Sequence, residues 1–184
     1  MQKDVADVQP YAFDTDRQAF VFVSASYEAV DKSSRAFFYQ GQRDVATRVF
    51  LIPAAQVDEL AEKLINAQKD AVALDKVLLV QSTGRCGSTL LSRLLSTISG
   101  VYSLSEPDVF SSLLFGHSCQ PDNLPRPALL KHLRSAAILL VRSTRAFRQQ
   151  PNEHIALKFR SFATLYSDAF RESIPEAKVC RGPQ

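Results

Sequence analysis

The stretch KVLLVQSTGRCGSTLLSRLLSTISG, residues 76–100, decides the fold of this chain. An apolar run ends in a short turn that contains Gly84 and Gly87, and a leucine-rich amphipathic segment follows. The run is typical of a buried parallel strand. The segment after it predicts a helix that begins near Ser88 and ends at Gly100. A strand that turns through glycines into a helix N-terminus is an arrangement that binds phosphate.

The rest of the chain repeats the alternation of strand and helix. Further buried strands are expected in VYSLS, EHIALKF and EAKVC, with helices at residues 54–69, from Pro107 onward, at 127–149 and at 161–174. Ser161 is expected to cap the last of these helices. This alternation predicts an α/β fold with a parallel sheet over residues 54–184. Residues 1–53 predict a separate β-rich segment, a small antiparallel meander with strands in QAFVFVSASY, SRAFFYQ and TRVFLIP.

Composition limits the classes of function. The chain has 184 residues, 46% of them hydrophobic, and a net charge of +3, which is too small to indicate a nucleic-acid partner. No signal-peptide pattern and no run of 18 apolar residues is seen, so we expect a cytoplasmic protein with no membrane span. The three cysteines and three histidines have no metal-site spacing, so no metal is expected. His132 and the arginines at 142, 145 and 148 are expected to lie on solvated helix faces.

The glycine turn differs from the loop of ATP- and GTP-binding proteins. That loop has four residues between its glycines and a lysine before the Ser/Thr, whereas only Arg85 and Cys86 separate Gly84 from Gly87. No apolar strand ends in an aspartate that could hold Mg²⁺. A shorter loop should hold one 5′-phosphate, with Arg85 supplying a fork of donors and with hydroxyls from Ser88 and Thr89. A strand–turn–helix junction that uses glycine only for its geometry is the alternative.

The segment TGRCGSTLLSRLL, followed by SEP, resembles the 5′-phosphosulfate loop of sulfotransferases. In that family a basic residue, a small residue, Gly and two Ser/Thr precede an apolar helix, and Arg85 to Leu90 follow this order with Cys86 in place of the usual serine. The resemblance implies a three-layer parallel sheet of the P-loop NTPase-like type and binding of 3′-phosphoadenosine 5′-phosphosulfate without a metal. The donor-binding residues would be Thr83, Gly84, Arg85, Cys86, Gly87, Ser88 and Thr89.

Two downstream residues extend the resemblance to the reaction. Glu106, in LSEPDVF, stands where related sulfotransferases carry the general base for the acceptor hydroxyl. Lys158, at the end of the strand HIALK, stands where the family carries a lysine that stabilises charge on the transferring sulfonyl group. Arg160 could take over the role of Lys158. The alternatives are a glutamate that favours a helix N-terminus and a lysine in solvent at a strand end.

The resemblance covers residues 76–179. Arg181 is similar to the family arginine that binds the 3′-phosphate, but the serine that follows it in the family has no counterpart before Gln184. We therefore expect a truncated, incomplete fold of marginal stability that self-associates through an exposed sheet edge. The leading hypothesis is sulfonyl transfer to an acceptor hydroxyl or amine. The alternatives are a non-catalytic nucleotide-binding or interaction module of the same fold, and a nucleotide kinase.

Overall fold

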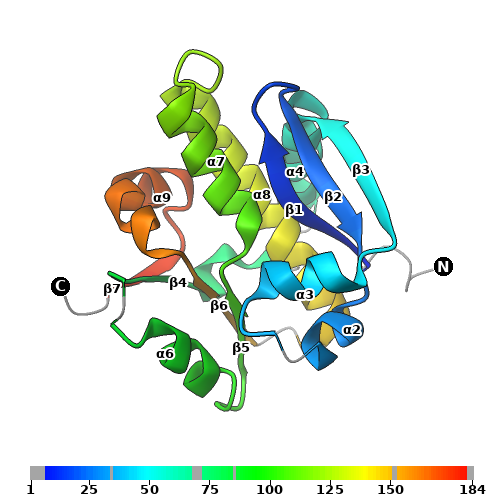
Figure 1. Cartoon of the computed structure of the whole chain (residues 1–184), viewed down its shortest axis with the longest axis vertical. Helices are drawn as coiled ribbons and strands as arrows, with labels where there is room; N and C mark the ends of the chain where they lie inside the picture. Colours follow the sequence, from blue (N-terminus) through cyan, green and yellow to red (C-terminus); the bar gives the residue numbers. More distant parts are fainter. Residues whose placement is uncertain (1–6, 34, 68–71, 85, 151–152, 182–184) are drawn as a thin grey trace.

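Two β-sheets organise the chain in the computed structural model, which describes residues 7–33, 35–67, 72–84, 86–150 and 153–181 (Figure 1). The antiparallel sheet has the order β1-β2-β3, with strands Val8–Asp14, Ala19–Ser24 and Arg48–Pro53. The parallel sheet has the order β5-β6-β4-β7, with strands Val101–Ser105, His154–Lys158, Val77–Gln81 and Lys178–Arg181. The chain is therefore an α/β protein with a small antiparallel sheet at its N-terminal end.

The helices lie around the two sheets. They are α2 (Tyr27–Lys32), α3 (Phe38–Val45), α4 (Ala54–Ala67), α6 (Ser88–Leu95), α7 (Asp108–Cys119), α8 (Arg126–Arg148) and α9 (Ser167–Ser173), with short 3₁₀ helices η1 (Leu74–Lys76) and η2 (Ser161–Tyr166). In Figure 1, α7 and α9 lie above the parallel sheet, α8 runs from the top of the molecule down past it towards α2, and α6 lies below it against β5 and β6. Leu79 of β4 and Leu157 of β6 are fully buried, as expected for strands covered on both faces.

The N-terminal sheet shares its core with the rest of the chain. β1 contacts α7 and α8, and the backbone N–H of Phe13 donates to Ser112 Oγ at 2.8 Å. The Tyr27 hydroxyl is buried and lies 3.0 Å from Ser143 Oγ and 2.9 Å from Thr144 Oγ1 of α8. Residues 1–53 are thus packed against the helices that surround the parallel sheet.

The prediction of a strand at residues 34–40 is wrong. The third strand of the meander is β1, and the aromatic run instead leads into α3, which begins at Phe38. Phe38, Gly41 and Gln42 are buried at helical spacing, so the 3.6-residue period prevails over the β propensity of the aromatic residues. Gly41 lies inside this helix, where an added Cβ would come within 2.9 Å of Val30 Cγ1, so it permits close packing of α3 on α2.

Two other local expectations also need correction. Ser161 is not a helix cap: it is the first residue of η2, the N-cap position is held by Arg160, and α9 begins only at Ser167. The helix after the glycine turn begins at Ser88 as predicted but ends at Leu95, before Gly100. Its apolar residues lie largely in solvent, with Leu90 62% and Leu94 53% exposed.

Candidate functional site

The glycine turn connects the end of β4 to the start of α6. Gly87 is the residue before the helix and has φ 81°, in the left-handed region that favours glycine. Gly84 has no such requirement, and an added Cβ would make only ordinary contacts with Ser161, at 3.8 Å from its Oγ. Thr83, Gly84 and Gly87 are exposed, and Ser88 and Thr89 are half-buried at the first turn of the helix. Arg85 lies outside the described residues.

The thiol of Cys86, in this turn, has a lowered pKa. Hydrogen bonds from the Ser82 hydroxyl and from the backbone and hydroxyl of Ser88 lower the pKa of the Cys86 thiol. Among the described residues, the source of this lowered pKa is the hydrogen bonding of the turn. Groups that stabilise a thiolate also donate to the oxygen atoms of an anion.

Glu106 and Lys158 meet at the carboxyl ends of neighbouring strands. Ser105 of β5 is in register with Lys158 of β6, so the residue that follows β5 lies against the end of β6. The Glu106 backbone N–H donates to the Lys158 carbonyl oxygen at 2.6 Å, and Lys158 Nζ donates to Glu106 Oε1. Lys158 is 3% exposed, and the Glu106 side chain is 13% exposed. The structure thus brings together the two residues that the sequence singled out.

Glu106 also has an unusual backbone conformation. Its φ is 56°, in the left-handed region. A residue other than glycine in this region costs about 1–3 kcal/mol, and such residues are found preferentially at functional sites. Pro107 follows as the residue before α7, so the short link from β5 to α7 is the position that places the carboxylate beside Lys158.

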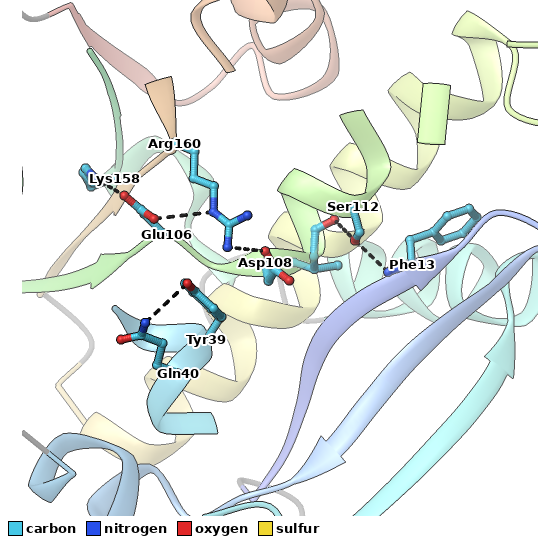
Figure 2. A network of polar contacts seen from close by, with 9 residues as sticks. Phe13, Tyr39, Gln40, Glu106, Asp108, Ser112, Lys158 and Arg160 are labelled. Carbon is cyan, nitrogen blue, oxygen red and sulfur yellow. Dashed lines mark hydrogen bonds and ion pairs between the residues drawn. The ribbon is translucent and has the colours of Figure 1, made fainter. Parts of the chain in front are cut away.

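Arg160 and Asp108 extend the ion pair into a chain of four charges (Figure 2). Arg160 Nε lies 3.4 Å from Glu106 Oε2, and its terminal nitrogen lies 2.9 Å from Asp108 Oδ1. Burial raises the pKa of Asp108; Arg160 opposes this effect and Glu106 adds to it. Asp108 was not predicted as a site residue, although an acidic residue in the first turn of α7 after Pro107 was the available signal.

Aromatic side chains from the N-terminal segment cover the two cations. Lys158 Nζ lies 5.6 Å from the centre of the Phe37 ring, and the Arg160 guanidinium lies 4.6 Å from that of Tyr39. The two rings are stacked on each other, 6.0 Å apart between centres. A cation over an aromatic face is attracted by about 0.5–2 kcal/mol. The contact of these rings with the cations was not predicted from the sequence, because residues more than a hundred positions apart form it.

The loop and the charge chain lie at the same edge of the parallel sheet. β4 pairs with β6, and the Phe159 N–H donates to the Val80 carbonyl oxygen at 3.0 Å, just before the loop. Arg181 ends β7 in register with Gln81, at this same edge. Ligands of open parallel sheets bind at the carboxyl ends of the strands, and the predicted site residues that are described all lie there.

Other polar residues of the sequence analysis are part of the packing. The expectation of a solvated His132 is wrong: its ring is 6% exposed, packs on Phe13 and lies 3.2 Å from Asp58 Oδ1. Arg145, only 8% exposed, also does not lie on a solvated face, because α8 is buried on most sides. Over the described ranges, no three His, Cys, Asp or Glu side chains are grouped as metal ligands. Within these ranges no helix is both long and apolar enough to cross a membrane.

Comparison with family models, with curated proteins and with solved structures finds no match. The function of the chain is therefore inferred from its own geometry and from the motif in its sequence.

Proposed function

We propose that the chain is a sulfotransferase-type protein that binds 3′-phosphoadenosine 5′-phosphosulfate and transfers its sulfonyl group to an acceptor hydroxyl or amine. One observation carries the proposal. Glu106 and Lys158, 52 positions apart, meet at the strand ends beside the glycine loop. A carboxylate and an ammonium group next to a phosphate-binding loop are the base and the charge-stabilising group that this transfer needs.

The donor site would be the loop from Thr83 to Thr89. The first backbone N–H groups of α6 have no partner within the helix, and they face the loop at the positive end of the helix dipole. Gly87, with φ 81°, allows the chain to turn into this helix. The sequence adds Arg85 to this set, as a fork of donors for the phosphosulfate. The order β5-β6-β4-β7, with the loop on an inner strand, supports a fold of the P-loop type.

The transfer would proceed in line. The acceptor oxygen forms a bond to sulfur while the bond from sulfur to the bridging phosphate oxygen breaks, and adenosine 3′,5′-bisphosphate leaves with that bond's electron pair. Glu106 takes the proton of the acceptor hydroxyl. Lys158 turns from Glu106 to the sulfonyl oxygens and steadies their charge. Arg160, 3.4 Å from the other carboxylate oxygen, keeps Glu106 in place after Lys158 has moved.

Calorimetric titration with adenosine 3′,5′-bisphosphate tests the donor site. A separate titration with ATP–Mg²⁺ serves as the comparison. Selective binding of the bisphosphate, lost in Arg85→Ala, is the expected result. Binding of ATP–Mg²⁺ in preference would instead indicate a nucleotide kinase. If Arg85→Ala binds the bisphosphate as tightly as the unchanged chain does, Arg85 is not part of the donor site.

A second candidate is a non-catalytic nucleotide-binding or interaction module of the same fold. The observation that favours it is the apolar surface of α6, where Leu90 and Leu94 are more than half exposed. Sedimentation at increasing protein concentration, together with donor turnover, separates the two candidates. Association without turnover of the donor favours the module, and turnover by the monomer excludes it.

A further inference from the structure

A small pocket lies beside the charge chain, between the N-terminal helices and the parallel sheet. It has a volume of about 150 Å³. One wall comes from α2, the start of α3, Ser33 and residues 35–37, and the other from α6 and β5. A cavity of about this volume accommodates a single six-membered ring.

The pocket adjoins the site through two of its lining residues. Ser105 lines it and directly precedes Glu106. Phe37 lines it as well, and the Phe37 ring lies over Lys158 Nζ at 5.6 Å. A molecule in this pocket would therefore lie next to the residues proposed for the transfer.

One buried hydroxyl of the pocket has no partner. Of the serines that line it, Ser33 donates to Val30 O, Ser96 donates to Ser92 O, and Ser92 and Ser103 bond each other. Ser105 is 9% exposed, and its Oγ forms no hydrogen bond with any described residue. Buried hydroxyls are almost always paired, so Ser105 Oγ is the group in this wall that a ligand would satisfy.

One cation of the pocket is available to an anion. Arg35 Nε is already bonded to Asp44 Oδ2 at 2.5 Å, and the Asp31 carboxylate accepts the Tyr102 hydroxyl at 2.6 Å. Arg93 of α6 lines the pocket, and its guanidinium has no ion pair or hydrogen bond with another described residue. Arg93 is therefore the cation of this lining that a ligand can pair with, and guanidinium binds carboxylates particularly well. Val30, Phe38 and Leu104 give the pocket an apolar lining for a ring.

We propose that this pocket binds a small monocyclic carboxylate that carries a hydroxyl group. The hydroxyl bonds to Ser105 beside Glu106, and the carboxylate bonds to Arg93. Its role as the acceptor rests on the proposed sulfonyl transfer, but the binding itself does not. The N-terminal segment then supplies one wall of a substrate site.

The test is calorimetric titration of the full chain with 4-hydroxybenzoate, phenol and benzoate, without nucleotide. Phenol lacks the carboxylate and benzoate lacks the hydroxyl, so 4-hydroxybenzoate should bind more tightly than either. Arg93→Gln should weaken it about 10-fold or more and leave phenol unchanged. The matched control is Arg171→Gln, an exposed arginine of α9 outside the pocket.

Ser105→Ala is the second variant. Because its hydroxyl has no partner to lose, the midpoint of thermal unfolding should stay unchanged or rise, while the preference for 4-hydroxybenzoate over benzoate disappears. Equal binding of all three compounds, no binding of any, or variants that bind like the unchanged chain would each overturn the proposal.

A parallel titration with adenosine 3′,5′-bisphosphate separates this inference from the proposed function. If 4-hydroxybenzoate binds and the bisphosphate does not, the pocket is a binding site but has no role in sulfonyl transfer. Binding of the bisphosphate alone keeps the donor site and overturns the pocket.

Discussion

Glu106 and Lys158 are joined twice, once through the backbone and once through their side chains. The Glu106 N–H donates to the Lys158 carbonyl oxygen at 2.6 Å, and the Lys158 ammonium donates to the Glu106 carboxylate. The backbone bond fixes the start of the Glu106–Pro107 turn on β6, whereas the side-chain pair can open. The two residues thus remain neighbours when Lys158 changes its partner, which is what the proposed transfer requires.

Lys158→Met should separate binding from transfer. Methionine keeps much of the buried side-chain volume but removes the charge that would steady the sulfonyl group. We expect the rate of donor consumption with a hydroxyl acceptor to fall by about 10²–10³-fold, with bisphosphate affinity changed by less than about 3-fold. Lys178→Met is the control, because Lys178 is exposed at the other end of the strands, at the start of β7. A full rate in Lys158→Met would exclude a role for this lysine.

Gly87→Ala and Gly84→Ala should differ sharply. Gly87 has φ 81°, so a Cβ there is strained although no atom lies within 4 Å of it. We expect Gly87→Ala to lower the free energy of unfolding by about 1 kcal/mol and to weaken bisphosphate binding at least 10-fold, because the entry into α6 must shift. Gly84→Ala should change the stability little. Thermal unfolding and calorimetry measure both effects, and equal behaviour of the two variants would contradict the assigned role of the turn.

Cys86 should react at a lower pH than an ordinary thiol. Because its pKa lies below the usual value, a larger fraction is thiolate at pH 7, and alkylation by iodoacetamide should be faster there and reach half its maximal rate at a lower pH. Cys119 and Cys180 are exposed and give the background, which Cys86→Ser measures. Adenosine 3′,5′-bisphosphate should slow labelling of Cys86 alone. Labelling at an undiminished rate with saturating bisphosphate would place the nucleotide elsewhere.

Asp58 should stabilise the packing of α4 on α8. Its carboxylate accepts the Ser135 hydroxyl at 2.7 Å and lies 3.2 Å from His132 Nδ1. Asp58→Ala leaves both groups buried without this partner and should lower the free energy of unfolding by about 2–4 kcal/mol. The control is Asp122→Ala, an exposed position in a turn. Bisphosphate affinity of the folded protein should not change, because Asp58 is remote from the loop.

The pH dependence of stability follows from the same carboxylate. Burial raises the pKa of Asp58, but hydrogen bonds from His132 and Ser135 outweigh burial and hold that pKa below its usual value. The stabilisation by Asp58 is therefore fully present above about pH 4, the pKa of an Asp carboxyl in the unfolded chain. It is lost as the pH falls through the lower pKa of Asp58 in the folded chain. In denaturant titrations between pH 6 and 3, Asp58→Asn should lose less stability than the unchanged chain. Parallel curves would show that other groups cause the acid sensitivity.

Local pattern predicted the elements that hold the site. β4, β5 and β6 are short apolar runs with turn residues after them, and the resemblance singled out Glu106 and Lys158 at the ends of two of these strands. The sequence could not predict α3, because aromatic residues with a high β propensity were placed by helical burial of Phe38, Gly41 and Gln42. Nor could it predict the contacts of Phe37 and Tyr39, which depend on how the N-terminal segment packs.

The buried polar residues also depend on packing between segments far apart in the chain. His132 was expected in solvent because its neighbours Lys131 and Arg134 are charged. It is instead held between α4 and the aromatic side chains of the antiparallel sheet. A helix with one polar and one apolar face is readily recognised in a sequence. α8 is covered by α4, α7, α9 and β1, and its buried positions cannot be separated by periodicity alone.

The rings of Phe37 and Tyr39 have a consequence for the response to salt. They lie where counterions would otherwise approach Lys158 and Arg160. Mobile ions screen exposed charge pairs strongly at about 0.15 M salt but reach covered pairs much less. The interactions of the two cations with Glu106 should therefore persist at ionic strengths that abolish surface ion pairs such as Lys32–Glu28. Without its N-terminal helices the protein would lack these covering rings. The ion pairs among Lys158, Glu106, Arg160 and Asp108 would then weaken steeply with added salt.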